Sequence, residues 1–295
     1  MNPLRIYQPQ ALSSNDPPDL ASLGYRFLAE GDSWFTIGAL NPAKNSNLLF
    51  ELAFGQSAAA VSCAYPGDTL RRMSAMSADP AFEQLLCGAL AWPWDGILLS
   101  AGGNDLIDAL QVGAAGVPPA QRLLLQAAEW GDAAQGAARY VSSAGWQTFA
   151  GYVQANLQHL LRLRDSGPAA GAPVFMHTYA VPTPRPAGAG LGAGPWLHPA
   201  LQAYAIPEAD RVALAAHLIG RLRDLLLACA ADAARFPALH VFDSTAVAVV
   251  PAAPGTTGES GDWVNEIHLG WRGYEKIAVP WARQIEQVIA QRRGG

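Results

Sequence analysis

The sequence predicts a three-layer α/β/α domain with a central parallel sheet of about five strands. Short apolar runs alternate with segments of helical periodicity along the chain. This alternation favours parallel strands that are joined by right-handed crossovers. Hydrophobic residues make up 51% of the 295 residues and charged residues only 15%, so the chain can bury a large core and does not resemble a disordered protein.

Five segments have the length and composition of buried strands. They are residues 24–30, 58–63, 94–100, 173–179 and 239–242. We expect them to pair in a flavodoxin-like order, in which ligands bind beyond the carboxyl ends of the strands. Polar residues that directly follow a strand are therefore the candidates for a functional site.

The spacing of apolar residues predicts helices between and after these strands. The helical segments are residues 46–54, 68–76, 146–164, 208–236 and 271–292. Ser46 is a candidate N-cap of the first helix. Pro280 is expected to interrupt the last helix, because proline cannot donate the backbone hydrogen bond that a helix interior requires.

Three stretches depart from this alternation. Residues 1–22 are polar and contain prolines, which predicts an arm on the surface, followed by a single domain over residues 23–295. Residues 106–145, mostly rich in Ala, Gly and Gln, are expected to form an insertion of weak helical content. The many prolines and glycines of residues 181–207 predict a long loop, a candidate lid, without a regular helix or a central strand.

Composition excludes several classes of function. The net charge is −5, and basic residues are adjacent only at Arg71–Arg72 and Arg292–Arg293, so we do not expect nucleic acid as a partner. Cys63, Cys87 and Cys229 are widely spaced in apolar stretches, which predicts small buried side chains and neither a disulfide framework nor a zinc site. No metal-ligand spacing, P-loop or dinucleotide-binding pattern occurs. We therefore expect no metal and no cofactor.

The N-terminus lacks the features of a secretory signal. It has no apolar core after a basic patch, and the longest apolar runs of the chain are too short to span a bilayer. These observations predict a cytoplasmic protein without an integral membrane segment. Export by a route that uses no cleaved signal stays open.

A small polar motif follows four of the five predicted strands. The motifs are Gly-Asp-Ser-Trp at 31–34, Gly-Asp-Thr at 67–69, Gly-Gly-Asn-Asp at 102–105 and Asp-Trp-Val-Asn-Glu-Ile-His at 262–268. Because parallel strands end at one edge of the sheet, we expect the four motifs to converge there.

The motif residues suit an acyl-transfer site. Ser33 is exposed by a tight turn after a strand and is the candidate nucleophile, but a serine hydroxyl needs a base within hydrogen-bond reach. His268 is the natural base, because a neutral imidazole titrates near working pH. The backbone N–H groups of Ser33 and Gly67, with the side-chain amide of Asn104, are three candidate donors to the oxyanion of the tetrahedral intermediate.

These residues resemble the sequence blocks of the SGNH (GDSL-type) hydrolases. GDSW at 31–34 is similar to the first block, Gly67 to the second-block glycine, GGND at 102–105 to the third-block G-x-N-D, and the stretch that ends at His268 to the fifth block. The blocks occur in the family's order over residues 31–268. The resemblance implies a flavodoxin-like SGNH hydrolase fold and the hydrolysis of esters, thioesters or lipid acyl groups through an acyl-enzyme.

The fifth block departs from the family pattern at two positions. Asn265 replaces the aspartate that precedes the histidine by three residues, and Leu269 replaces the proline that follows it. An asparagine can accept a hydrogen bond from the imidazole but cannot stabilise the imidazolium by charge. Asn265 is the positional match for the orienting residue, Asp262 is a substitute that can reach in from the loop, and Glu266, which a helical turn would point away, comes last.

Aromatic residues near the motifs can line a substrate pocket. Trp34 and Trp263 are the candidates, whereas for Trp196 packing and pocket lining are equally expected. Asp32 and Asp105 are expected to fix turns, Asp32 by accepting backbone N–H groups and Asp105 by capping the helix that follows it. The remaining histidines are expected to pack on the surface or in the core; they are His159, His177, His198, His217 and His240.

Three functions agree with these residues. The first is an ester hydrolase acting on a small-molecule or lipid ester. The second is an acyltransferase that uses the same serine and excludes water from its acyl-enzyme. The third is a binding protein of the same fold with weak activity, which the asparagine at position 265 favours. The acyl group and the oligomeric state stay open at this stage.

Overall fold

The computed structural model describes residues 1–36, 46–75, 77, 80–190 and 192–294. Its centre is a six-stranded parallel sheet with the strand order β2-β5-β3-β6-β7-β8. The strands are β2 (Arg5–Tyr7), β3 (Tyr25–Gly31), β5 (Ala58–Ser62), β6 (Gly96–Ser100), β7 (Val174–His177) and β8 (Leu239–Phe242). The five predicted strands are all present, and every strand step in the sheet is parallel as expected.

The sixth strand comes from the segment expected to be a surface arm. β2 pairs in parallel with β5 at the edge of the sheet, and β1 (Asn2–Pro3) pairs antiparallel with β4 (Ala53–Phe54). Leu4, between β1 and β2, is buried and donates its N–H to the Leu52 carbonyl at 2.9 Å. A three-residue strand has too short a pattern to be recognised in a polar, proline-bearing sequence.

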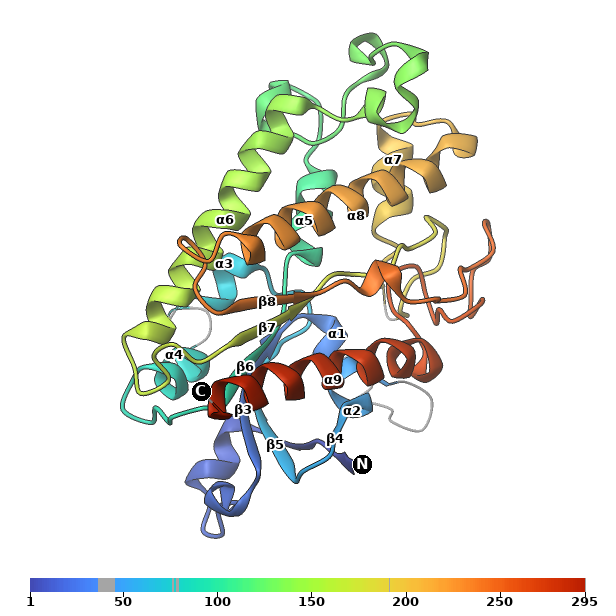
Figure 1. The fold of residues 1–295 in the computed structure, drawn as a ribbon. Coiled ribbons are helices and arrows are strands. Elements are labelled where there is room, and N and C mark those ends of the chain that lie inside the picture. Colours follow the sequence, from blue (N-terminus) through green and yellow to red (C-terminus); the bar gives the residue numbers. More distant parts are fainter. Residues whose placement is uncertain (37–45, 76, 78–79, 191, 295) are drawn as a thin grey trace.

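Helices cover both faces of the sheet. In Figure 1, α6 (Ser143–Asp165) and α8 (Glu208–Ala231) lie on one side of the strands and α9 (Trp271–Gly294) lies on the other. Serine caps α6, since Ser142 Oγ accepts the Gly145 N–H at 3.0 Å. The predicted three-layer α/β/α architecture is confirmed.

The shorter helices complete the layers and the loops. The α-helices are α1 (Ser33–Thr36), α2 (Leu48–Glu51), α3 (Leu70–Met73), α4 (Pro80–Leu86), α5 (Gly103–Gln111) and α7 (Leu197–Ala203). The 3-10 helices are η1 (Pro9–Ser13), η2 (Leu20–Ser22), η3 (Pro119–Gln121), η4 (Ala127–Glu129), η5 (Ala133–Tyr140) and η6 (Ser244–Ala246). Three of the 3-10 helices, η3 to η5, lie in the insertion for which weak helical content was predicted.

Three local predictions were wrong. Residues 181–207 contain a regular helix, α7, because its proline, Pro199, lies in the first turn, where no intrahelical N–H bond is lost. Pro280 lies inside α9, and the helix is continuous from Trp271 to Gly294. The N-cap of α2 is Asn47, whose Oδ1 accepts the Phe50 N–H at 3.0 Å, and not Ser46.

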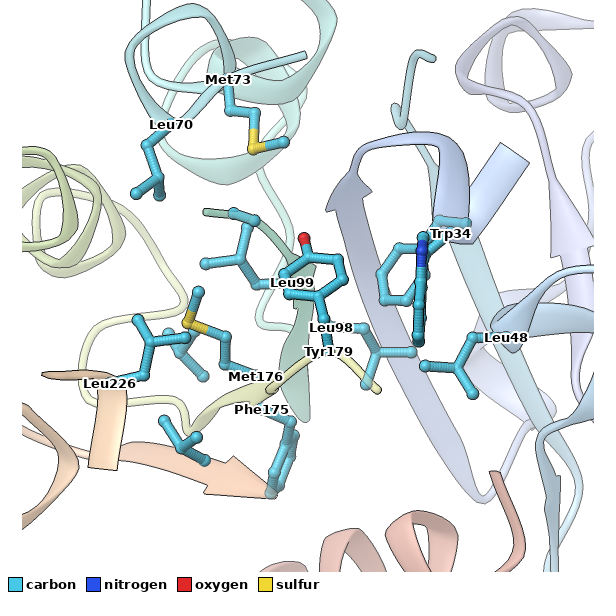
Figure 2. Close-up of a cluster of buried hydrophobic side chains, with 14 of the residues drawn as sticks. Trp34, Leu48, Leu70, Met73, Leu98, Leu99, Phe175, Met176, Tyr179 and Leu226 are labelled. Carbon is cyan, nitrogen blue, oxygen red and sulfur yellow. The ribbon is translucent and has the colours of Figure 1, made fainter. Parts of the chain in front are cut away.

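The main core fills the space on both faces of the sheet and reaches the first polar motif. Figure 2 shows Trp34 close to Leu48 within this cluster of buried side chains. The Trp34 ring stacks on His177 at a centroid distance of 5.5 Å and meets Tyr179 and Tyr274 edge to face at 5.0 and 5.4 Å. Ser33 is therefore followed directly by a side chain that the core holds in place.

Over the part of the chain that the structure describes, no helix combines the length and hydrophobicity that crossing a bilayer requires.

Candidate active site

Ser33 begins a short helix at the carboxyl end of β3. A Cβ at Gly31 would lie 2.9 Å from Ser100 Cβ, so the close approach of β3 and β6 requires glycine there. Asp32 caps the helix that follows, because its Oδ1 accepts the Trp34 N–H at 3.0 Å and its carbonyl accepts the Phe35 N–H at 3.1 Å. The Ser33 side chain is thus fixed at the rim of the sheet, where its residue is 8% exposed.

His268 meets Ser33 across 235 residues of sequence. The loop after β8 brings His268 Nε2 to 2.7 Å from Ser33 Oγ. This is hydrogen-bond distance for a hydroxyl and a ring nitrogen. The structure therefore brings together the two side chains that the sequence proposed as nucleophile and base.

Asn265 orients the imidazole ring. Its Oδ1 lies 2.9 Å from His268 Nδ1 and also accepts the backbone N–H groups of Ile267 at 3.1 Å and His268 at 2.9 Å. An amide oxygen can only accept, so His268 Nδ1 must carry the proton and Nε2 is left to accept the Ser33 hydroxyl. The turn that Asn265 makes with its own backbone is what holds its oxygen under the ring.

Asp262 does not reach His268, and its prediction as a substitute orienting residue was wrong. One carboxylate oxygen, Oδ2, lies 2.5 Å from Lys276 Nζ and accepts the Val250 N–H at 2.7 Å. These contacts tie the loop to α9 and to the segment after η6. Lys276 and Val250, which are distant in sequence, fix the orientation of the Asp262 carboxylate. The residues around Asp262 in the sequence do not predict these two contacts.

Glu266 is fully buried, and its carboxylate bonds to segments other than the one that carries His268. Its carboxylate accepts the backbone N–H groups of Leu197 at 2.9 Å and His198 at 2.7 Å, and that of Trp196 as well. Arg185 donates a fourth backbone N–H at 3.2 Å. Burial raises the pKa of Glu266, although these four N–H groups act in the opposite direction. Glu266 was the last candidate for orienting His268, and its bonds to the start of α7 could not be predicted from the sequence.

Gly67 occupies a tight turn at the end of β5. The turn runs from Tyr65 to Asp68, whose N–H donates to the Tyr65 carbonyl at 3.2 Å. Proline at the second position and a glycine with φ of +86° at the third are the signature of a type II turn. A non-glycine residue is disfavoured at that φ, which explains the glycine in this motif.

Asn104 lies beside this turn, in the first turn of α5. Its side-chain Nδ2 donates to the Asp68 carbonyl at 3.0 Å. An amide has two N–H donors, so the second remains for a ligand. Both Asn104 and Ser33 line the same pocket. Within the described residues, Gly67 itself is exposed and does not line that pocket.

Asp32 fixes the first motif, as predicted. Its carboxylate is buried and accepts the Ser100 hydroxyl at 2.8 Å and the Tyr179 hydroxyl at 2.5 Å, in addition to the Trp34 N–H. Burial raises the pKa of Asp32 to about 6, against the effect of these hydrogen bonds. Ser100 ends β6 and Tyr179 follows β7, and no sequence pattern predicts that they meet Asp32.

Asp105 caps a helix other than the one predicted. Its carboxylate accepts the Leu70 N–H at 3.1 Å, at the start of α3, and the Tyr152 hydroxyl at 2.8 Å. Asp105 itself lies inside α5, whose N-cap is Gly102. The prediction was therefore wrong about the helix, because only the fold brings the start of α3 within hydrogen-bond distance of Asp105.

Burial keeps His268 neutral. The side chain is 2% exposed, and desolvation lowers the pKa of His268 to about 3. A neutral ring with a protonated Nδ1 is the form that can remove a proton from Ser33. The edge of the Trp196 ring meets the His268 ring at a centroid distance of 5.4 Å, so tryptophan shields one side of the base.

An apolar pocket opens beside Ser33. Its volume is about 40 Å³, and its lining includes Trp34, Leu106, Ile107, Leu197 and Ile267 in addition to Ser33 and Asn104. Trp34 is thus one of the residues that line this pocket. Trp263 does not line it, because it is 2% exposed and belongs to the main core, where the loop folds back so that Trp263 bridges Ser260 and Leu269.

No metal-binding group accompanies the site. Within the described ranges, no three side chains of the His, Cys, Asp or Glu type gather to hold an ion.

His177 is fully buried under Trp34, where desolvation lowers its pKa to about 4. In the described residues, Cys63, Cys87 and Cys229 form no disulfide bond; Cys229 is buried, and Cys63 and Cys87 are half-buried.

Comparisons with known proteins identify the fold. No protein-family model matches this sequence, and no curated protein is similar to it in sequence. The solved structure of the lipase Lip_vut3 from a goat rumen metagenome is 16% identical, with 88% of this chain and 97% of the lipase covered and a TM-score of 0.51. The chain has the fold of this lipase. The α/β/α fold expected from the resemblance to the SGNH hydrolases is thereby confirmed.

Two further solved structures cover a similar share of the chain. An extracellular lipase from Streptomyces rimosus is 16% identical, with 89% of this chain and 100% of the lipase covered and a TM-score of 0.48. A provisionally assigned SGNH hydrolase from Slackia heliotrinireducens is 13% identical, with 88% and 97% covered and a TM-score of 0.44. Identities this low establish no activity, so activity must be inferred from the site.

Proposed function

We propose that this protein is a serine ester hydrolase of the SGNH type, with Ser33 as nucleophile and His268 as general base. The observation that carries the proposal is the chain of hydrogen bonds from Ser33 Oγ to His268 Nε2 and from His268 Nδ1 to Asn265 Oδ1. A nucleophile, a base and a group that orients the base recur in acyl-transfer sites on unrelated folds.

The proposed reaction has two stages. Ser33 Oγ attacks the ester carbonyl carbon while its proton moves to His268 Nε2. The tetrahedral intermediate collapses, the C–O bond to the alcohol breaks, and the alcohol leaves with the proton from His268. Water then attacks the acyl-enzyme and gives a proton to His268, and the acid leaves as that proton returns to Ser33.

The proposed oxyanion hole consists of the backbone N–H groups of Ser33 and Gly67 and the side-chain amide of Asn104. The hydrogen bond of Asn104 to the Asp68 carbonyl supports this role, because it fixes the amide before substrate arrives. Asn265 orients His268 but carries no charge to offset the imidazolium. Turnover is therefore expected to be slower than with a carboxylate at that position.

A fluorophosphonate probe tests the assignment of the nucleophile. The probe should form a covalent adduct on the intact protein, and peptide mapping should locate the adduct at Ser33, because only this hydroxyl is hydrogen-bonded to a buried neutral imidazole in the described residues. Prior heat denaturation should abolish labelling. Absence of any adduct, together with stabilisation of the folded protein by an ester ligand, would instead support a binding protein of this fold.

Replacement of Asn104 by alanine should lower kcat for a p-nitrophenyl ester by about 100-fold to 1,000-fold, the usual cost of one oxyanion donor. Labelling of Ser33 should slow as well, whereas the melting temperature should change little. Asn156→Ala, which removes a half-buried asparagine on α6, is the matched control and should leave kcat unchanged. Equal kcat values for both variants would remove Asn104 from the proposed oxyanion hole.

A further inference from the structure

The helix α7 contributes a single side chain, Leu197, to the wall of the pocket beside Ser33. Leu197 is the first residue of α7 and packs with Ile267 and Ile107 in a small cluster separate from the main core. The pocket volume of about 40 Å³ holds no more than a few water molecules. While α7 stays in place, a short acyl group therefore fits this pocket better than a long one.

The buried carboxylate of Glu266 fixes the start of α7. It accepts the N–H groups of Trp196, Leu197 and His198, which are donors that a helix leaves without internal partners. An ionised carboxylate suits this position because the N-terminal end of a helix carries partial positive charge. The same residue that sets the position of Leu197 therefore sets the width of the pocket.

Glu266 is itself tied to the segment that carries the base. Its N–H donates to the Ala187 carbonyl at 2.9 Å, and the Arg185 guanidinium donates to the Asn265 carbonyl at 2.7 Å. Arg185 is fully buried and also reaches Thr256 and Gly258. In this segment, the Asn265 side chain orients the imidazole, and the side chain of the next residue, Glu266, bonds to the start of α7.

We propose that Glu266 is a positioning residue that restricts the enzyme to esters of short acyl groups, of acetyl to butyryl size, by holding α7 and Leu197 against the pocket. The proposal rests on the proposed ester hydrolase function. Glu266 touches neither the substrate nor His268 in this arrangement. Its effect reaches the reaction only through the wall that it fixes.

The test compares p-nitrophenyl acetate with p-nitrophenyl octanoate. The wild-type protein should favour acetate in kcat/KM by tenfold or more, about the discrimination that a hydrophobic pocket achieves by size. In Glu266→Gln, the amide presents N–H groups to the helix N–H donors, so α7 should loosen and the ratio of octanoate to acetate should rise by about tenfold or more. Leu197→Ala should raise the same ratio directly, because it removes the wall side chain and leaves the Glu266 cap intact.

Controls separate this proposal from the assignment of the nucleophile. Glu275→Gln makes the same substitution at an exposed position on α9 and should leave the ratio unchanged. Fluorophosphonate labelling of Ser33 should persist in all three variants and shows that each is folded with its nucleophile intact. A wild-type preference for octanoate, or an unchanged ratio in labelled Glu266→Gln and Leu197→Ala, would overturn the proposal, whereas loss of labelling in the wild-type protein would overturn the hydrolase function beneath it.

Discussion

Replacing Ser33 by alanine should lower kcat for ester hydrolysis by about a millionfold, the usual cost of removing a serine nucleophile. The loss should be this large because no other hydroxyl in the described residues is hydrogen-bonded to His268. The measurement is the initial rate on p-nitrophenyl acetate, together with fluorophosphonate labelling, which should vanish. The melting temperature should stay close to that of the wild-type protein, since the change removes one oxygen atom at the rim of the sheet.

The matched control for this variant is Ser166→Ala. Ser166 is an exposed serine after the end of α6, and its hydroxyl bonds only to the nearby Leu163 carbonyl. Its replacement should leave rate and labelling unchanged. If Ser33→Ala keeps more than a small fraction of the hydrolysis, another group carries the nucleophilic attack and the assignment fails.

Replacing His268 by alanine should cost about as much as losing the nucleophile, because the two act as one unit. The change also leaves a cavity between Ser33, Asn265 and Trp196 in which free imidazole can bind. Added imidazole should therefore restore part of the lost rate in a concentration-dependent way. A structural defect alone would not respond to imidazole, so this measurement separates a base from a packing residue.

His159→Ala provides the comparison, since His159 is exposed on α6. It should retain the full rate and show no response to imidazole. A His268→Ala variant that is folded, inactive and unresponsive to imidazole, yet still labels at Ser33 at the wild-type rate, would contradict the role of His268 as base.

The sequence predicts five of the six strands of the central sheet, and the four motifs, because their signals are local. Each of these strands is a short apolar run. Three motifs come soon after such a run and the fourth lies in the loop past the last one, so the parallel arrangement alone predicts that they meet at one edge of the sheet. The encounter of Ser33 with His268 and the orientation of the ring by Asn265 could be expected on these grounds. The edge strand β2 could not, because three residues carry too little pattern.

The errors concern contacts between segments that are distant in sequence. The stretch 262–268 contains three polar candidates for orienting His268, namely Asp262, Asn265 and Glu266. Only the fold shows that Asp262 bonds to Lys276 and that Glu266 bonds to the start of α7. Trp263 was expected at the pocket but lies in the core. The sequence of a loop does not show which of its side chains face the core and which face the pocket. A proline-rich composition likewise hid α7, because one proline in a first helical turn is compatible with a helix.

The two halves of the reactive pair come from segments 235 residues apart in the chain. Closing so long a connection costs chain entropy that only the intervening packed strands and helices can offset. During refolding from denaturant, ester turnover should therefore recover no earlier than the tryptophan fluorescence of the packed core. A protease cut that releases the chain from before His268 onward should abolish ester turnover even where the sheet stays folded. Catalysis thus serves as a reporter of the completely assembled chain.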